Sequence, residues 1–133
     1  MIPAPGQALN DLAMRLMLSI APQTANTFAA ADSMLVGQLM LTLSQEFERA
    51  VDTRMQDIDE LQVLFSQARP DAARNRFATI TPASFHLQDV NALHDVGMRL
   101  LIELHTEVEL TDPDLNLLIW LFLREHSERH KFN

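Results

Sequence analysis

Hydrophobic positions recur every three or four residues along most of the chain, a spacing that predicts α-helices. Four segments show it, at residues 7–20, 25–68, 88–109 and 113–130. Threonine and valine never form the alternating runs that are typical of strands. The pattern predicts an all-α protein. We expect its four main helices to form one antiparallel, up-and-down bundle, a single helical domain of residues 1–133.

The second predicted helix, residues 25–68, is long for a chain of 133 residues. It would extend about 65 Å, and no other segment could pair with all of it. We therefore expect a kink or break near Gly37, or a helix whose two parts pack against different neighbours. In the third helix, Gly97 predicts a point where a neighbouring helix approaches closely.

A long connection, residues 69–87, separates the second and third helices. Pro70 and Pro82 punctuate it, and its stretch PDAARNRF predicts a short helix. Aromatic anchors at Phe77 and Phe85 indicate that the connection folds over the bundle. Long connections of this kind in compact helical domains often carry function.

The last predicted helix carries more apolar surface than a small bundle readily covers. Eight of the nine residues from Leu115 to Leu123 are apolar, well short of the ~20 that a membrane span needs. A helix that is apolar all round is central in its fold or is covered by a second chain. We expect a homodimer interface on this helix, with the connection or the first helix as the alternative cover. The expected interface residues are Leu117, Trp120, Leu121 and Arg124.

Charge and composition limit the kinds of partner that the protein is expected to bind. The formal net charge of −8 disfavours binding to nucleic acid and to anionic membrane surfaces. The absence of cysteine excludes disulfides and thiolate chemistry and fits a reducing compartment. The first residues lack the basic and apolar regions of a signal peptide, so we expect a cytoplasmic protein. We expect no cofactor.

Four arginines are candidates for anion binding. Arg54 lies on the apolar side of the second helix, where it either binds an anion or extends past the edge of the core. Arg69, Arg74 and Arg76 form the one basic concentration, in the long connection. They could hold a phosphate or a carboxylate, or pair with acids of the same fold.

Histidines raise the question of a metal. His126 and His130 stand four residues apart on one helix face, a spacing that can hold an ion. No HExxH arrangement is present, and His130 lies three residues from the last residue of this sequence. His105 and Glu109 share another face and could join a site with a carboxylate of another helix. We expect these histidines to be core-edge residues, and no metal site.

Three functions follow from these observations. The first is a small cytoplasmic protein of interaction or regulatory type, without catalytic activity, that forms a homodimer through its last helix and could also bind another protein. The second is a bundle that binds an apolar or anionic small molecule, lined by some of the seven methionines. The third is a metal-dependent enzyme whose histidine and carboxylate ligands are brought together by folding.

Overall fold

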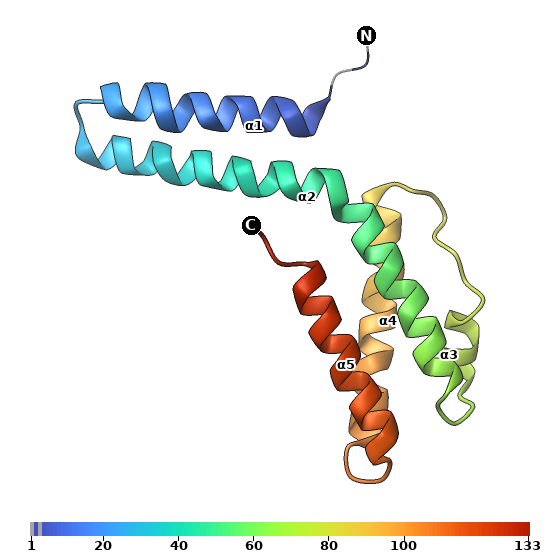
Figure 1. Cartoon of the computed structure of the whole chain (residues 1–133). Coiled ribbons are helices and arrows are strands. Elements are labelled where there is room, and N and C mark those ends of the chain that lie inside the picture. The colour runs from blue at the N-terminus through green and yellow to red at the C-terminus, as the bar shows by residue number, and fades with distance from the viewer. Residues whose placement is uncertain (1, 3) are drawn as a thin grey trace. The chain divides into compact units, whose positions relative to one another are not determined.

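A computed structural model describes residue 2 and residues 4–133, and every regular element in this described part is helical (Figure 1). The prediction of an all-α protein is confirmed, and the four predicted segments correspond to four of the helical stretches. In chain order the elements are α1 Pro5–Arg15, a π-helical turn Leu16–Ile20, a 3-10 turn Ala21–Gln23, α2 Thr27–Ser66, α3 Ala72–Phe77, α4 Leu87–Val108 and α5 Pro113–Arg129.

The chain divides into two compact units, and the division falls inside α2. The first unit is Met1–Ala50 with Phe132, and the second is Val51–Lys131 with Asn133. α2 is helical without interruption through Gly37, so the expected break there is absent. Instead, the two parts of α2 belong to different units, which was the alternative to a break. A single antiparallel bundle of all four long helices stays a prediction.

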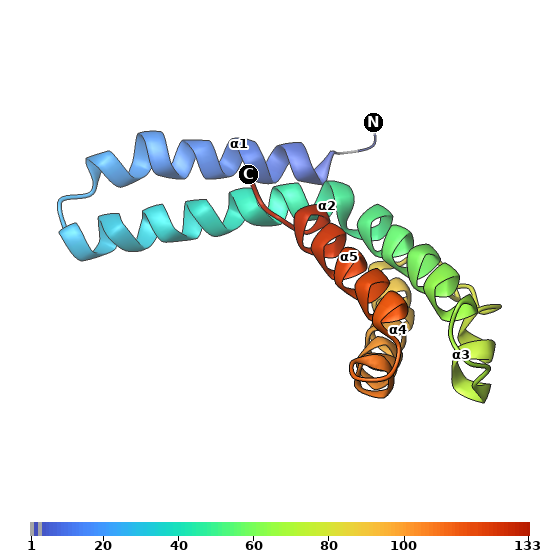
Figure 2. The same cartoon turned by 60° about the horizontal axis from the view of Figure 1, so that its bottom comes forward.

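The first unit is a helical hairpin in which α1 lies beside the first part of α2 (Figures 1 and 2). Its helices meet through small residues. The Ser44 hydroxyl donates a 2.7 Å hydrogen bond to the carbonyl oxygen of Gly6, and Ala13 is fully buried. A Cβ atom added at Gly37 would lie 2.3 Å from Cγ of Met17, so the glycine permits the close approach of the two segments.

The second unit has a core of large apolar side chains to which α2, α3, α4 and α5 all contribute. Gly97 of α4 makes room for two of them, because a Cβ atom there would lie 2.6 Å from Cζ of Phe77 and 2.9 Å from Cδ1 of Leu61. The close approach predicted at Gly97 is thus confirmed. The core residues are Ile58, Leu61, Leu64, Phe65, Phe77, Val90, Leu93, Leu100, Leu101, Leu104, Val108, Leu115, Ile119 and Phe122.

The long connection contains the predicted short helix, α3, and is fastened to the second unit. Asp71 caps α3 by accepting hydrogen bonds from the backbone N–H groups of Ala73 and Arg74, both at 3.1 Å. Phe77 is buried, and the Gln62 side chain donates to its carbonyl oxygen at 3.0 Å. The connection therefore packs on the helices as expected, although Phe85 is exposed.

A short turn joins α4 to α5, so these helices form an antiparallel hairpin. Asp112 accepts a 3.1 Å hydrogen bond from the backbone N–H of Leu115 and caps α5. Because the turn covers residues 109–112, positions at equal distances before and after it face one another. No helix within the described part combines the length and the apolar character that crossing a membrane requires.

Candidate metal centre

Four side chains of the second unit converge at one point: Asp57 of α2, His94 of α4, and His126 and His130 at the end of α5. One potential ligand atom from each residue lies within 4.8 Å of all the others. Asp57 is fully buried, and the histidine side chains are 12%, 24% and 22% exposed in the order given. The cluster is therefore close to the core and still within reach of solvent.

The helical core pattern places these residues. Asp57 stands four residues before Leu61, and His126 four residues after Phe122, so each continues the buried stripe of its helix by one turn. His94 precedes the α4–α5 turn by about as many residues as His126 and His130 follow it. The antiparallel hairpin thus brings the three imidazoles together.

All three imidazoles approach the same oxygen atom, Oδ2 of Asp57. The distances are 2.9 Å from Nε2 of His94, 2.8 Å from Nδ1 of His126 and 2.6 Å from Nε2 of His130. A carboxylate oxygen offers two lone pairs, so three nitrogen neighbours exceed what ordinary hydrogen bonding to that oxygen requires. Convergence of this kind is typical of ligands that surround a cation.

The other oxygen of Asp57 is held separately. Arg129 of α5 donates to Oδ1 of Asp57 through one guanidinium nitrogen and to Glu60 through another. An outer partner that fixes a ligating carboxylate in this way is a regular feature of protein metal sites. Arg129 is the last residue of α5 and directly precedes His130, so its bonds to Asp57 and Glu60 hold the end of the helix next to the cluster.

The environment keeps Asp57 ionised. Burial alone would raise its pKa, but the hydrogen bonds from His94, His130 and His126 outweigh burial and hold the pKa of this carboxyl far below its usual range. Burial likewise opposes the charge on Arg129, and its hydrogen bonds to Glu60 and Asp57 raise its pKa. The carboxylates of Asp57 and Glu60 and the guanidinium of Arg129 together carry a net charge of −1 beside the imidazoles. This charge favours a bound cation.

The geometry fits a zinc-class ion. Zn²⁺ binds imidazole nitrogen at about 2.0–2.1 Å and carboxylate oxygen at about 2.0–2.2 Å, which separates tetrahedral ligand atoms by about 3.3 Å. The observed separations run from 2.6 Å up to at most 4.8 Å, so small side-chain rotations would bring all four atoms into place. Three imidazoles and one carboxylate suit Zn²⁺, Cu²⁺ or Ni²⁺ better than Mg²⁺ or Ca²⁺.

Sequence reasoning found half of this cluster. His126 and His130 were the candidate pair, whereas Asp57 and His94 were missed as ligands. His105 and Glu109 lie outside the cluster: the His105 ring meets Trp120 edge-on, with centroids 5.5 Å apart, and Glu109 is exposed. Asp57 gave one usable signal, because a carboxylate on the buried side of a helix needs a partner of opposite charge or a metal.

The four arginine candidates for anion binding lie in different surroundings. Arg74 is buried and pairs with Glu107, with Nη1 at 3.2 Å from Oε1, while Arg54 is half-buried on α2. Arg69 and Arg76 are exposed. The pairing of Arg74 with an acid of the same fold was the alternative to anion binding.

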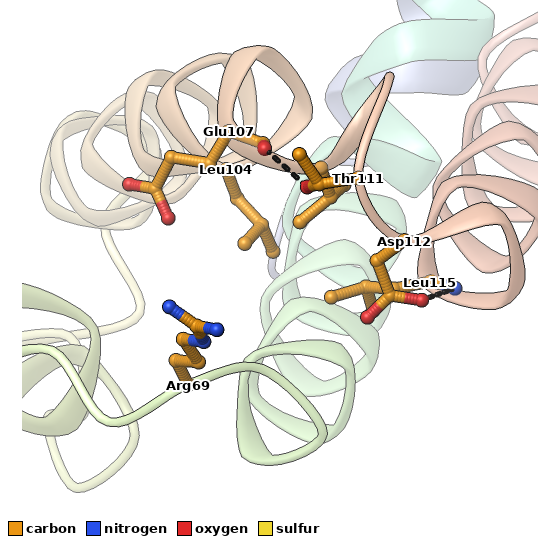
Figure 3. A pocket seen from close by; sticks show the side chains of 7 residues that line it. Arg69, Leu104, Glu107, Thr111, Asp112 and Leu115 are labelled. Carbon is orange, nitrogen blue, oxygen red and sulfur yellow. Dashed lines mark hydrogen bonds between the residues drawn. The ribbon is translucent and has the colours of Figure 1, made fainter.

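Arg69 borders a cavity of about 390 Å³ at the α4–α5 turn (Figure 3). Two acids, Glu107 and Asp112, face the same space together with the apolar side chains of Leu104 and Leu115. These acids reduce the attraction of the cavity for an anion. Anion binding by Arg69 stays a prediction.

The expected interface residues lie on the outer side of α5. The side chains of Leu117, Trp120 and Leu121 are 59%, 55% and 38% exposed, and Arg124 is exposed as well. Their role in a homodimer stays a prediction.

Comparison of the chain with protein-family models, with curated proteins and with solved structures finds no match.

Proposed function

We propose that this protein binds one divalent transition-metal ion of the zinc class through Asp57, His94, His126 and His130. The observation that carries the proposal is the convergence of three imidazole nitrogens on one buried carboxylate oxygen, at 2.6–2.9 Å. This carboxylate is ionised, and Arg129 donates a hydrogen bond to its other oxygen, so its orientation is fixed for binding a cation.

The proposed ion has a structural role. Catalytic zinc sites bind the metal through three protein ligands and leave a fourth position for water or substrate, whereas structural sites fill all four positions with protein atoms. Here four side chains from three helices supply four ligands. The ion therefore cross-links α2, α4 and the end of α5, and the protein acts without catalysis at this centre.

Binding to the folded state alone stabilises a protein in proportion to the logarithm of the free metal concentration. The second unit should therefore unfold at a higher temperature when Zn²⁺ is added, and a chelator should reverse the effect. The expected gain is about 2.7 kcal/mol at a free Zn²⁺ concentration 100 times the dissociation constant.

The test is calorimetric titration of Zn²⁺ into protein that carries no histidine tag, compared with two single variants. The wild type should bind one equivalent, and His94→Gln should lose more than about 100-fold in affinity, since loss of an outer partner alone costs about 10- to 100-fold. His86→Gln is the matched control, because His86 is exposed and lies outside the cluster. Less than about a tenth of an equivalent in the wild type, or equal binding by His94→Gln, would contradict the proposal.

A further inference from the structure

The outer side of the first part of α2 carries large apolar side chains that no described residue of the first unit covers. Leu35, Leu39, Leu43 and Phe47 follow one another at four-residue intervals and are 55–58% exposed. Phe28 is 82% exposed and Val36 is 41% exposed. This set of six residues is called the α2 ridge below. Side chains four residues apart lie on one face of a helix, so the ridge is an apolar strip that one charged residue, Asp32, interrupts between Phe28 and Val36.

The hairpin cannot take these side chains into its own interior. Its two helices already touch at Gly37, where the side chain of Met17 fills the space in which a Cβ atom would lie. On the same inner side, Ser44 is bonded to the backbone of Gly6, and Ala13 is fully buried. An interior of glycine, alanine and serine buries little apolar surface. A hairpin with so small an interior gains stability when a further surface covers its outer side.

The distribution of charge along the sequence indicates where two copies of the chain can approach each other. Residues 28–47, which carry the ridge, contain two charged residues, Asp32 and Glu46, and Glu46 lies 3.6 Å from the guanidinium of Arg49, so two copies of the ridge can meet with little like-charge repulsion. Residues 51–131, in contrast, carry 14 acids against 8 bases, a net −6, which disfavours contact between the second units of two copies. The ridge is thus the place at which two chains of this acidic protein can approach each other most readily.

We propose that the α2 ridge pairs with the ridge of a second copy, so that two hairpins form a four-helix bundle about a two-fold axis. Hairpin pairing of this kind buries an apolar stripe of each helix pair, as in ordinary bundles. If each of the six side chains loses on the order of 100 Å², the ridge loses on the order of 600 Å² per copy. Contacts of the flanking residues would raise the area buried per copy toward the value of a standard interface, about 800 Å² from each partner.

The first experiment is sedimentation velocity on the full chain at micromolar concentration. The wild type should be a dimer, and the double variant Leu39→Glu/Leu43→Glu should be a monomer with unchanged helical circular dichroism, because both positions are exposed in the single chain. The matched control is Trp120→Glu, at an equally exposed apolar position on α5, the interface expected from the sequence. Because the proposal places the dimer contact on the ridge in place of α5, this variant should stay dimeric. A monomeric wild type would overturn the proposal. So would a dimer that Trp120→Glu dissociates and the ridge variant does not.

The second experiment uses the absence of cysteine from the sequence. A single Leu39→Cys substitution places the only thiol at the centre of the ridge, where a two-fold axis brings the two copies of this position closest. Mild oxidation should convert most of the protein to a covalent dimer. Leu110→Cys, at a 93% exposed site in the second unit, should cross-link far less. Equal cross-linking of the two variants would overturn the proposal, as would a monomer that binds phosphatidylcholine vesicles through the ridge.

Discussion

The two units of this chain bury opposite kinds of residue. In the first unit the buried positions are small, such as Ala13 and Ala21, while leucines and phenylalanines lie outside. In the second unit the large apolar side chains are inside, and with them a fully buried carboxylate, Asp57. A unit with a well-packed core can hold four polar side chains in a defined geometry. A unit whose large apolar residues face outward offers them for contact with another surface.

The largest contrast concerns large-to-small substitutions. Leu61→Ala should lower the free energy of unfolding by about 2–5 kcal/mol at any protein concentration, because Leu61 is fully buried in the second unit. Leu39→Ala should act only through association, so its effect should disappear on dilution to a concentration at which the wild type is monomeric. Urea unfolding at two protein concentrations measures both. If the free energy of unfolding lost in Leu39→Ala stayed the same on dilution, Leu39 would act within its own chain and not through association.

A smaller contrast concerns the two glycines at close approaches. Gly97→Ala forces a Cβ atom against the buried ring of Phe77 and against Leu61, and should cost about 1–3 kcal/mol as an overpacked site. Gly37→Ala meets the flexible Met17 side chain, which is only half-buried and can turn away. The gain in helix propensity, about 1 kcal/mol, offsets that movement. Thermal unfolding should show a clear loss for Gly97→Ala and little change for Gly37→Ala. Equal losses would mean that both units are equally tightly packed.

The smallest contrast concerns the helix caps and their dependence on pH. The backbone N–H of Arg74 chiefly lowers the pKa of the Asp71 carboxyl, which caps α3 in the second unit. Asp71 therefore contributes stability above the pKa of the unfolded chain, and this contribution is lost as the pH falls through the lower pKa of the folded protein. In the first unit, the neutral amide oxygen of Asn26 caps α2 by accepting from the N–H groups of Phe28 and Ala29.

The loss caused by Asp71→Ala should consequently shrink in acid, whereas the loss caused by Asn26→Ala should not. Hydrogen exchange of the capped N–H groups of Ala73 and Phe28, followed from neutral pH downward, measures the two caps separately. An Asp71→Ala effect that is independent of pH would show that the charge of the cap is irrelevant.

The sequence predicted the helices well because hydrophobic periodicity is a local property. The four main helices and the short helix in the connection all follow from residues within a few positions of one another. Only Gly37 was misread as a break, since a glycine inside a helix can serve close packing as well as bending.

The cluster was harder to predict because its members are far apart in the sequence. Asp57 lies 37 residues before His94 and 69 before His126, so only the tertiary fold brings them together. The spacing of His126 and His130 was visible, but their distance from a carboxylate was not. The hydrogen bond from Arg129 to Asp57 holds the end of α5, and it could not be predicted from local sequence patterns because the two residues are 72 positions apart.

X-ray absorption at the zinc edge, on protein loaded with one equivalent of Zn²⁺, measures directly whether the four side chains bind the ion. The account predicts four nitrogen and oxygen neighbours at about 2.0–2.1 Å, with the outer-shell scattering of three imidazoles. His94→Gln should reduce the imidazole count to two. A shell of six oxygens without imidazole scattering would contradict the account, because it would mean that the ion binds surface carboxylates and not this cluster.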